Sequence, residues 1–358
     1  MSVSSLGYRS AFLGKALRLP KLNKNLLATL STGRGQEIKY THYSAFVHKQ
    51  RLLPLMTAVN IKGEAFSAPV RTGNEPWDFS DQVEKQYQLA GSFYANDLNT
   101  FDRGHLVRRI DPCWGNADIA SQAETETFKW INCTPQHKKL NQKGGVWYQL
   151  EQHVLEHGVK NKIADISVFA GPVLDEKDKV FTKQYKGKDF QIPVVFWKVI
   201  VWKKSNGKLY AVGFMMSQYE WIKDKLKDVP APQRAFRKRA TEALADDYFE
   251  NLKFSDNKTY QVPVAAIEKA TGIKFSWNNV SFPYKARAFK EVRSVPLKKV
   301  FAFDNLHPSK TQMRGVLPVG KAAGAIVKKA LSKKEIITRS RQGLQATMKR
   351  YELKNITL

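Results

Sequence analysis

The sequence predicts an α+β fold in which a mixed, mostly antiparallel sheet is flanked by helices. Several runs are rich in β-branched and aromatic residues, and turn residues join two of these runs directly. Amphipathic stretches with a helical period lie between other runs. The chain has 358 residues, of which 42% are hydrophobic, so it can bury a substantial core.

Strand signals fall in two parts of the chain. Residues 40–61 predict an opening hairpin, because two extended runs surround the basic turn from His48 to Arg51. Later strands are expected within residues 166–175, 192–204 and 208–218, with a tight turn at 205–207 between the last two. Residues 66–79 contain Gly, Pro and Asn and predict a loop.

Helices are expected in four segments, within residues 80–94, 118–133, 146–159 and 262–275. The third places Val146, Leu150, Val154 and Leu155 on one face and is expected to end at Gly158. The fourth is expected to end at Gly272. Residues 132–142, broken by Pro135, predict a polar loop.

The charge balance predicts a polyanionic partner. Lys and Arg outnumber Asp and Glu by 59 to 32, and the formal net charge is +27. The two cysteines, Cys113 and Cys133, argue against a disulfide scaffold and fit a reducing compartment. Together with His105 and His137 they could supply four zinc ligands, but no C-x-x-C pair occurs, so two ordinary buried thiols are favoured.

The chain divides by composition into three parts: an N-terminal basic arm over residues 1–36, a folded domain over 37–284 and a basic C-terminal extension over 285–358. The extension has eighteen basic and four acidic side chains, and we expect it to grip nucleic acid backbone or to dock a partner. A C-terminal helix pair capping the core is the alternative.

The sequence predicts an intracellular, cytoplasmic protein. No run of about eighteen apolar residues occurs, so we expect no membrane span. The arm has no acid before Glu37 and has the composition of a mitochondrial transit peptide, which keeps mitochondrial import open. The favoured interpretation is an ordered arm that packs on the domain through four apolar side chains, namely Phe12, Leu13, Leu17 and Leu19.

The stretch Asp102-Arg103-Gly104-His105 supplies groups that suit phosphodiester hydrolysis. A neutral imidazole can take a proton from water, so His105 is the candidate base. A guanidinium can bind two phosphate oxygens, and glycine permits close approach. Asn and Glu side chains downstream offer the oxygen donors that Mg²⁺ prefers, either directly or through its bound waters.

Taken together, these motifs resemble the DNA/RNA non-specific endonucleases of the ββα-metal, or His-Me finger, class, to which endonuclease G belongs. The resemblance covers roughly residues 40–277. The family pattern is D-R-G-H, then N-x-x-P-Q with a second Asn nine residues after the first, then W-x-x-L-E. The matching positions are Asp102 to His105, Asn132 with Pro135 and Gln136, Asn141, and Trp147 with Leu150 and Glu151.

The resemblance implies a role for each matching residue. His105 would be the general base, and Asn141 the one direct protein ligand of a single Mg²⁺, for which Mn²⁺ could substitute. Glu151 would hold metal-bound water. Asn132 and Arg103 would be auxiliary groups around the scissile phosphate.

Four further basic residues are expected to contact nucleic acid. The family arginine that stabilises the transition state would fall on Arg71, with Arg51 as the fallback. Arg108, Arg109 and Lys138 are expected to bind the substrate backbone.

One departure from the family concerns the spacing between Asn141 and Glu151, which is ten residues here and usually eight. On a continuous helix, two additional residues would rotate Glu151 by about 200°. We therefore expect a loop at Gly144-Gly145 and a finger helix from Val146 to Glu156. Leu155 also stands where the family often has a basic residue, so the phosphate grip is expected to be relocated.

These observations predict Mg²⁺-dependent hydrolysis of phosphodiester bonds in DNA and RNA. The alternative is a catalytically inactive nucleic-acid-binding protein of the same fold. A secreted nuclease is disfavoured by the two cysteines and the lack of a secretory leader. Since an intracellular nuclease must be restrained, an inhibitor, a regulatory partner or homo-oligomerisation is expected.

Overall fold

The computed structural model describes residues 6–31, 37–63, 69, 75–95, 101–142, 145–152, 165–176, 178–204, 206–227 and 260–283. Arg71, the Lys143-Gly144 pair, the end of the third expected helix and the C-terminal extension lie outside the described residues.

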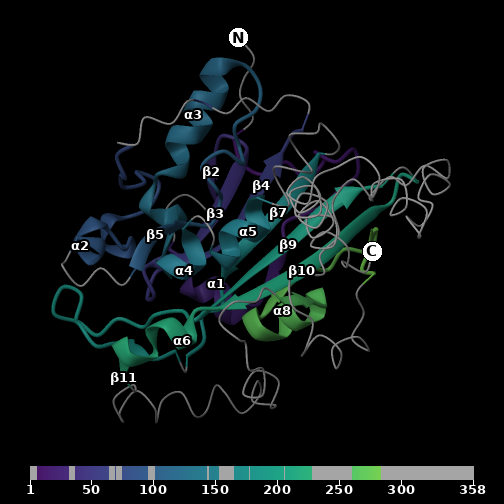
Figure 1. Cartoon of the computed structure of the whole chain (residues 1–358). Coiled ribbons are helices and arrows are strands. Elements are labelled where there is room, and N and C mark those ends of the chain that lie inside the picture. Colours follow the sequence, from purple (N-terminus) through teal and green to yellow (C-terminus); the bar gives the residue numbers. More distant parts are fainter. Residues whose placement is uncertain are drawn as a thin grey trace, which may run out of the picture.

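An eight-stranded sheet forms the centre of the fold (Figure 1). Seven strands follow the order β12-β10-β9-β7-β4-β3-β2, and each is antiparallel to its neighbours, whereas β14 pairs with β10 in parallel. The strands are β2 (Ile38–Tyr40), β3 (Tyr43–His48), β4 (Leu53–Ile61), β7 (Ile166–Pro172), β9 (Val195–Lys203), β10 (Leu209–Ser217), β12 (Tyr260–Val262) and β14 (Val280–Ser281). The predicted α+β class with a mostly antiparallel sheet is confirmed.

The longest strands lie where β-branched and aromatic residues concentrate in the sequence. β9 and β10 pair over nine residues and form the expected hairpin, and Gly207 in their connection has a φ of 74°. β3 and β4 form the expected opening hairpin. Local composition and turn residues were therefore sufficient to predict these pairs.

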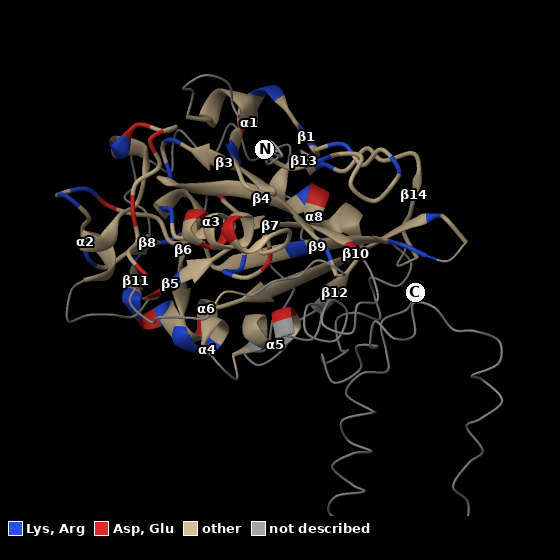
Figure 2. Ribbon diagram, turned by 90° about the horizontal axis from the view of Figure 1, so that it is seen from above, with Lys and Arg blue, Asp and Glu red and all other residues tan. Residues whose placement is uncertain are grey.

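Hydrophobic side chains cover both faces of the sheet. Successive side chains of β9 point to opposite faces and join two different clusters. Phe196 and Ile200 belong to one cluster with Trp147 of α5 (Val146–Gln152). Trp197 and Val199 belong to the opposite cluster, which includes α8 (Val264–Thr271). Figure 2 shows α5 and α8 on opposite sides of the sheet.

The N-terminal arm packs on the α8 side of the sheet. Leu13 and Leu17 are buried there, and Phe12 and Leu19 are partly buried against the same cluster, as predicted for an ordered arm. The arm also contains β1 (Lys21–Leu22), which pairs with β13 (Ile273–Lys274), and α1 (Lys24–Thr29). Residues 6–31 are therefore part of the folded body.

Gly272 ends α8 as predicted. Its φ of 72° is left-handed, and its N–H donates to the carbonyl oxygen of Glu268 at 2.9 Å. Glycine adopts this conformation without the steric cost that a Cβ atom would add.

A separate two-stranded sheet, β5–β6, lies on the α5 side of the large sheet and corrects one prediction. Residues 133–137, expected as loop, form β6 (Cys133–His137), which pairs with β5 (Phe101–His105), and α4 (Lys138–Asn141) follows at once. Pro135 lies opposite Arg103 in this two-stranded sheet. A proline is tolerated there because its missing N–H can face away from the single partner strand.

Two other segments differ from prediction in detail. Residues 80–94 form only a 3-10 turn, η1 (Lys85–Tyr87), and one helical turn, α2 (Gly91–Tyr94). The helix expected within 118–133 is α3 (Ala117–Thr127), followed by η2 (Trp130–Asn132). The remaining described elements are β8 (Val180–Phe181), α6 (Tyr219–Ile222), η4 (Lys223–Lys225) and β11 (Leu226–Lys227). None of the described helices is long and apolar enough to cross a membrane.

Candidate active site

A cavity of about 1080 Å³ opens beside the β5–β6 hairpin, and it gathers most of the predicted site residues. Its lining includes Arg103, His105, Arg108, Arg109, Asn141 and Glu151. These side chains come from β5, the turn after it, α4 and α5, so pairing of the hairpin and packing of the two helices bring them together. Lys138 is exposed on α4 outside this lining.

His105 ends β5 and is half-buried between two aromatic rings. Its ring centroid lies 4.5 Å from that of Trp77 and 5.0 Å from that of Phe128. The preceding Gly104 passes directly over Gln136 of β6, and a Cβ atom at this position would collide with the Gln136 side chain. The motif glycine therefore permits the close strand approach that places the imidazole.

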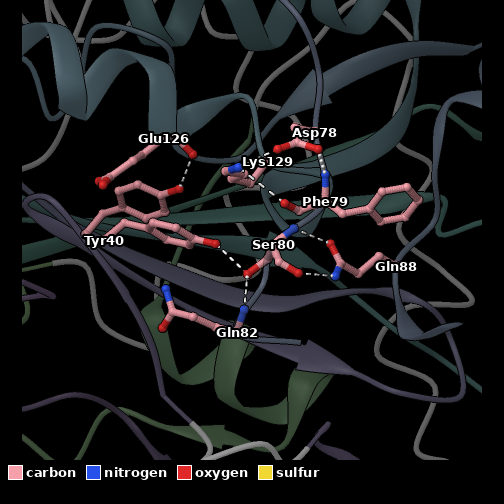
Figure 3. Close-up of polar contacts among 9 residues, drawn as sticks. Tyr40, Asp78, Phe79, Ser80, Gln82, Gln88, Glu126 and Lys129 are labelled. Carbon is pink, nitrogen blue, oxygen red and sulfur yellow. Dashed lines mark hydrogen bonds and ion pairs between the residues drawn. The ribbon is translucent and has the colours of Figure 1, made fainter. Parts of the chain in front are cut away.

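The segment that directly follows Trp77 is held in place by hydrogen bonds and an ion pair (Figure 3). Asp78 forms an ion pair with Lys129 at 2.8 Å, and its backbone N–H donates to the Phe128 carbonyl at 3.0 Å. Tyr40 donates its hydroxyl to Ser80 Oγ at 2.5 Å. The loop that carries Trp77 is thus anchored to the strand and the helix on either side of it.

Asn141 and Asp102 form the oxygen-rich end of the cavity. Asn141 Nδ2 donates to Asp102 Oδ2 at 3.2 Å, and Gln142 Nε2 donates to Asp102 Oδ1 at 3.1 Å. Only the nitrogen of an amide can donate a hydrogen bond to a carboxylate. The Asn141 nitrogen therefore faces Asp102, and Oδ1 is the atom of this amide that can bind a metal. Asp102 therefore orients the residue that was predicted to bind a metal.

Glu151 reaches the cavity because α4 and α5 are separate helices. α4 ends at Asn141, Gln142 is extended, and α5 begins at Val146, as predicted from the two glycines. Glu151 is buried, and its Oε1 accepts from Lys198 Nζ of β9 at 2.8 Å. The longer spacing thus does not turn the carboxylate away from the site.

The arginines of the site differ in how strongly they are held. Arg103 is exposed, with its guanidinium carbon 5.9 Å from the Trp77 ring. Arg109 forms an ion pair with Glu124, and Arg108 Nη1 donates to the Glu151 carbonyl at 3.4 Å. Arg103 is therefore the guanidinium best placed to move toward a substrate.

Besides Lys138, two other predicted residues are not brought to the cavity. Asn132 is fully buried, its Nδ2 donates to the carbonyls of Val107 and Thr127 at 2.9 Å, and its Oδ1 accepts from Val107 N at 2.9 Å. With its amide engaged in this way, Asn132 holds the chain after β5 in place and does not face a phosphate. Arg51, the fallback for Arg71, is buried in an ion pair with Asp178 at 2.5 Å.

Both cysteines are buried thiols, as predicted. Burial raises the pKa of the Cys133 thiol to about 12, and its Sγ lies 3.4 Å from the Tyr94 hydroxyl. Among the residues that the structure describes, no group of three or more His, Cys, Asp and Glu is placed to hold a metal ion.

Asp111 is buried and directly follows the cavity-lining residues Arg109 and Ile110. Its Oδ2 accepts from the Arg108 backbone N–H at 3.1 Å. Burial raises the pKa of its carboxyl to about 7, although the charges of Lys198 and Arg108 act to lower it. The folded protein thus holds a proton at pH values where an exposed aspartate has lost it.

We predict that Asp111→Asn changes how stability depends on pH. Between about pH 4 and 7 the unfolded chain releases the Asp111 proton while the folded protein keeps it, so this group favours folding less as pH rises. The variant does not lose stability in this way. The difference in unfolding free energy, variant minus wild type, should therefore increase by about 2 kcal/mol from pH 5 to pH 7.

Urea unfolding at both pH values measures this difference. The exposed Asp118 of α3 provides the control, and the effect of Asp118→Asn should vary much less with pH. A difference between Asp111→Asn and wild type that is the same at both pH values would contradict the raised pKa.

Three residues of the site were not predicted. Asp102 orients Asn141, Trp77 contacts His105, and Lys198 contacts Glu151. Asp102 could have been identified from its place in the D-R-G-H motif. Trp77 and Lys198 carried no local signal, because their partners are distant in the sequence.

Comparisons with known proteins relate the chain to nucleases. Residues 23–281 match the model of the DNA/RNA non-specific endonuclease family. The uncharacterised protein y4fB of Sinorhizobium fredii (strain NBRC 101917 / NGR234) is 34% identical over 310 residues, which cover 81% of this chain and 42% of y4fB. A salivary endonuclease of Culex quinquefasciatus is 30% identical over 103 residues, 28% of this chain and 26% of that protein.

The chain thus spans less than half the length of either curated relative. Among solved structures, the EndoG/EndoGI complex matches with a TM-score of 0.45 and 16% identity. That match covers 70% of this chain and 91% of the matched chain.

Proposed function

The chain belongs to the DNA/RNA non-specific endonuclease family, and we propose that it hydrolyses phosphodiester bonds of DNA and RNA with the help of one Mg²⁺ ion. The β5–β6 hairpin and α5 correspond to the ββα finger of this family. The observation that carries the proposal is the cavity, whose lining combines an imidazole, an amide, a buried carboxylate and an exposed guanidinium.

In the proposed reaction His105 is the general base. A neutral imidazole can accept a proton from a water molecule at ordinary pH while the water oxygen bonds to phosphorus. The bond from phosphorus to the leaving sugar oxygen breaks, and that oxygen takes a proton from solvent. Trp77 and Phe128 hold the ring at the cavity wall, which limits its rotation and supports a fixed direction of proton transfer.

The residues present fit a Mg²⁺ ion. Asn141 offers an amide oxygen, and Asp102 fixes the orientation of that amide. Glu151, which lines the same cavity, would hold water on the ion by hydrogen bonds. When bound, Mg²⁺ supplies a Lewis acid that stabilises charge on the scissile phosphate and the leaving oxygen. Such sparse protein ligation is typical of Mg²⁺, which keeps several of its waters, and Mn²⁺ is expected to substitute.

Basic side chains would hold the substrate backbone. Arg103 is exposed at the cavity and can bind phosphate oxygens through two N–H groups, with Arg108 beside it. The net charge of +27 would favour binding of any polyanion. Contacts to one phosphate do not read bases or the 2′-hydroxyl, which supports activity on both DNA and RNA.

We predict that the protein cleaves plasmid DNA and a structureless RNA with Mg²⁺ or Mn²⁺ and loses both activities in excess chelator. The assay follows product formation on gels, and re-addition of metal is expected to restore cleavage. Cleavage that persists in chelator would contradict metal dependence. Binding of both substrates without cleavage under any metal would instead identify the inactive nucleic-acid-binding alternative.

A further inference from the structure

Lys198 occupies an apolar position in the middle of the sheet. It lies on β9 between Phe196 and Ile200, both of which face the cluster beneath α5, so the two-residue period of the strand places Lys198 on this same face. Its cross-strand partners are Phe214 of β10 and Ala170 of β7. Only 2% of Lys198 is exposed. The side chains of these two cross-strand neighbours are apolar, so neither can pair with its charge.

The hydrogen bond and the ring contact of the Lys198 ammonium group are both made to α5. Nζ donates to Glu151 Oε1 at 2.8 Å and lies 4.5 Å from the centroid of the Trp147 ring. Trp147 and Glu151 are four residues apart and therefore lie on one face of the helix, one above the other. A single lysine thus fixes both the rotation of α5 and the position of the Glu151 carboxylate.

Stability alone does not account for this pair. Moving a lysine and a glutamate out of water is costly, and well-packed apolar residues at both positions would be equally stable or more so. One end of the pair, however, is not sealed in the core, because Glu151 lines the cavity. The lysine therefore holds the Glu151 carboxylate at the boundary between the apolar core and the candidate active site.

We propose that Lys198 is a positioning residue that holds the Glu151 carboxylate directed into the cavity. The inference rests on the proposed function, in which Glu151 binds water on the metal ion. Lys198 engages Oε1, so Oε2 is the oxygen assigned to the cavity. Lys198 itself does not touch substrate, because it lies beneath Glu151 and is buried.

The first test compares Lys198→Met with wild type. Methionine fills a similar volume without the charge, and kcat should fall about 10- to 100-fold, as for other residues that orient metal-bound groups. The KM for nucleic acid should change by less than about threefold, since no substrate contact is lost. Calorimetry should show weaker Mg²⁺ binding. Lys198→Arg, which keeps a positive charge, should recover part of the loss.

Lys203→Met is the matched control. Lys203 is exposed at the end of the same strand, so this change removes one positive charge without touching α5. Its kcat and Mg²⁺ affinity should equal those of wild type. If Lys203→Met lowers kcat as much as Lys198→Met does, the effect comes from net charge and the inference is wrong.

The decisive comparison is made in a Glu151→Gln background. If Lys198 acts through Glu151, adding Lys198→Met to Glu151→Gln should leave kcat unchanged within about threefold, because the interaction is already lost. In chelator, the double variant should also be more stable to urea than Lys198→Met alone, which leaves a buried carboxylate without its partner. The kcat comparison between Glu151→Gln and the double variant remains possible even if Lys198→Met alone does not fold.

Two results overturn the inference, and they are distinguishable. If wild type is active and the loss of kcat in the double variant equals the product of the losses in the two single variants, Lys198 acts independently of Glu151. A wild-type protein that cleaves no nucleic acid with any divalent metal would overturn the proposed function, and this inference with it.

Discussion

The His105→Ala variant is expected to lose at least about 10²- to 10⁴-fold in kcat while it still binds duplex DNA. The imidazole is the only group in the cavity lining with an ordinary pKa close to neutral, so its removal eliminates water activation. The phosphate contacts of the arginines remain. Single-turnover cleavage measures the first effect, and fluorescence anisotropy in chelator measures the second.

His137→Asn is a suitable control for that experiment. His137 belongs to the same hairpin but lies outside the cavity lining, and its Nδ1 caps α4 by accepting from Lys139 N at 3.2 Å. Asparagine is a good cap, so both fold and activity should be retained. Near-wild-type turnover of His105→Ala would end the general-base assignment.

Asn141→Ala is expected to reduce activity at least about 100-fold, with partial recovery as the Mg²⁺ concentration is raised. The amide oxygen of Asn141 is the proposed direct ligand, and losing one ligand among several weakens metal binding without abolishing it. Calorimetric titration of Mg²⁺ into the protein measures this loss directly, without dependence on turnover.

Gln142→Ala separates Asn141 from its neighbour. Gln142 also donates to Asp102 and lines the same cavity, so it is the other amide that could serve as a ligand. Its removal should lower Mg²⁺ affinity much less than Asn141→Ala does. Unchanged metal binding in Asn141→Ala, together with a loss in Gln142→Ala, would move the ligand to Gln142.

Much of the fold could be predicted because its signals are local. β9 and β10 concentrate β-branched and aromatic residues around a glycine turn, and α8 ends at the glycine that the sequence indicated. The failure at β6 has an equally physical cause. Cys133–His137 contains a proline and polar residues and has little strand propensity of its own, so it becomes a strand only through pairing with β5.

The candidate site was predicted unevenly for the same reason. The spacing of motif residues indicated His105, Asn141 and Glu151, which the structure brings to one cavity. The same pattern also suggested Asn132, but residue type does not reveal whether an amide faces a cavity or is engaged by buried carbonyls. That distinction depends on how the segment after β5 packs against α3.

The sequence by itself determined the class of fold and the break between α4 and α5, because each depends on residues close together in the chain. Only the tertiary structure decided the partners of the site residues. Lys198 and Glu151 are 47 positions apart and meet because β9 passes beneath α5. Such contacts follow from the packing of a helix on a sheet, a geometry that no local pattern encodes.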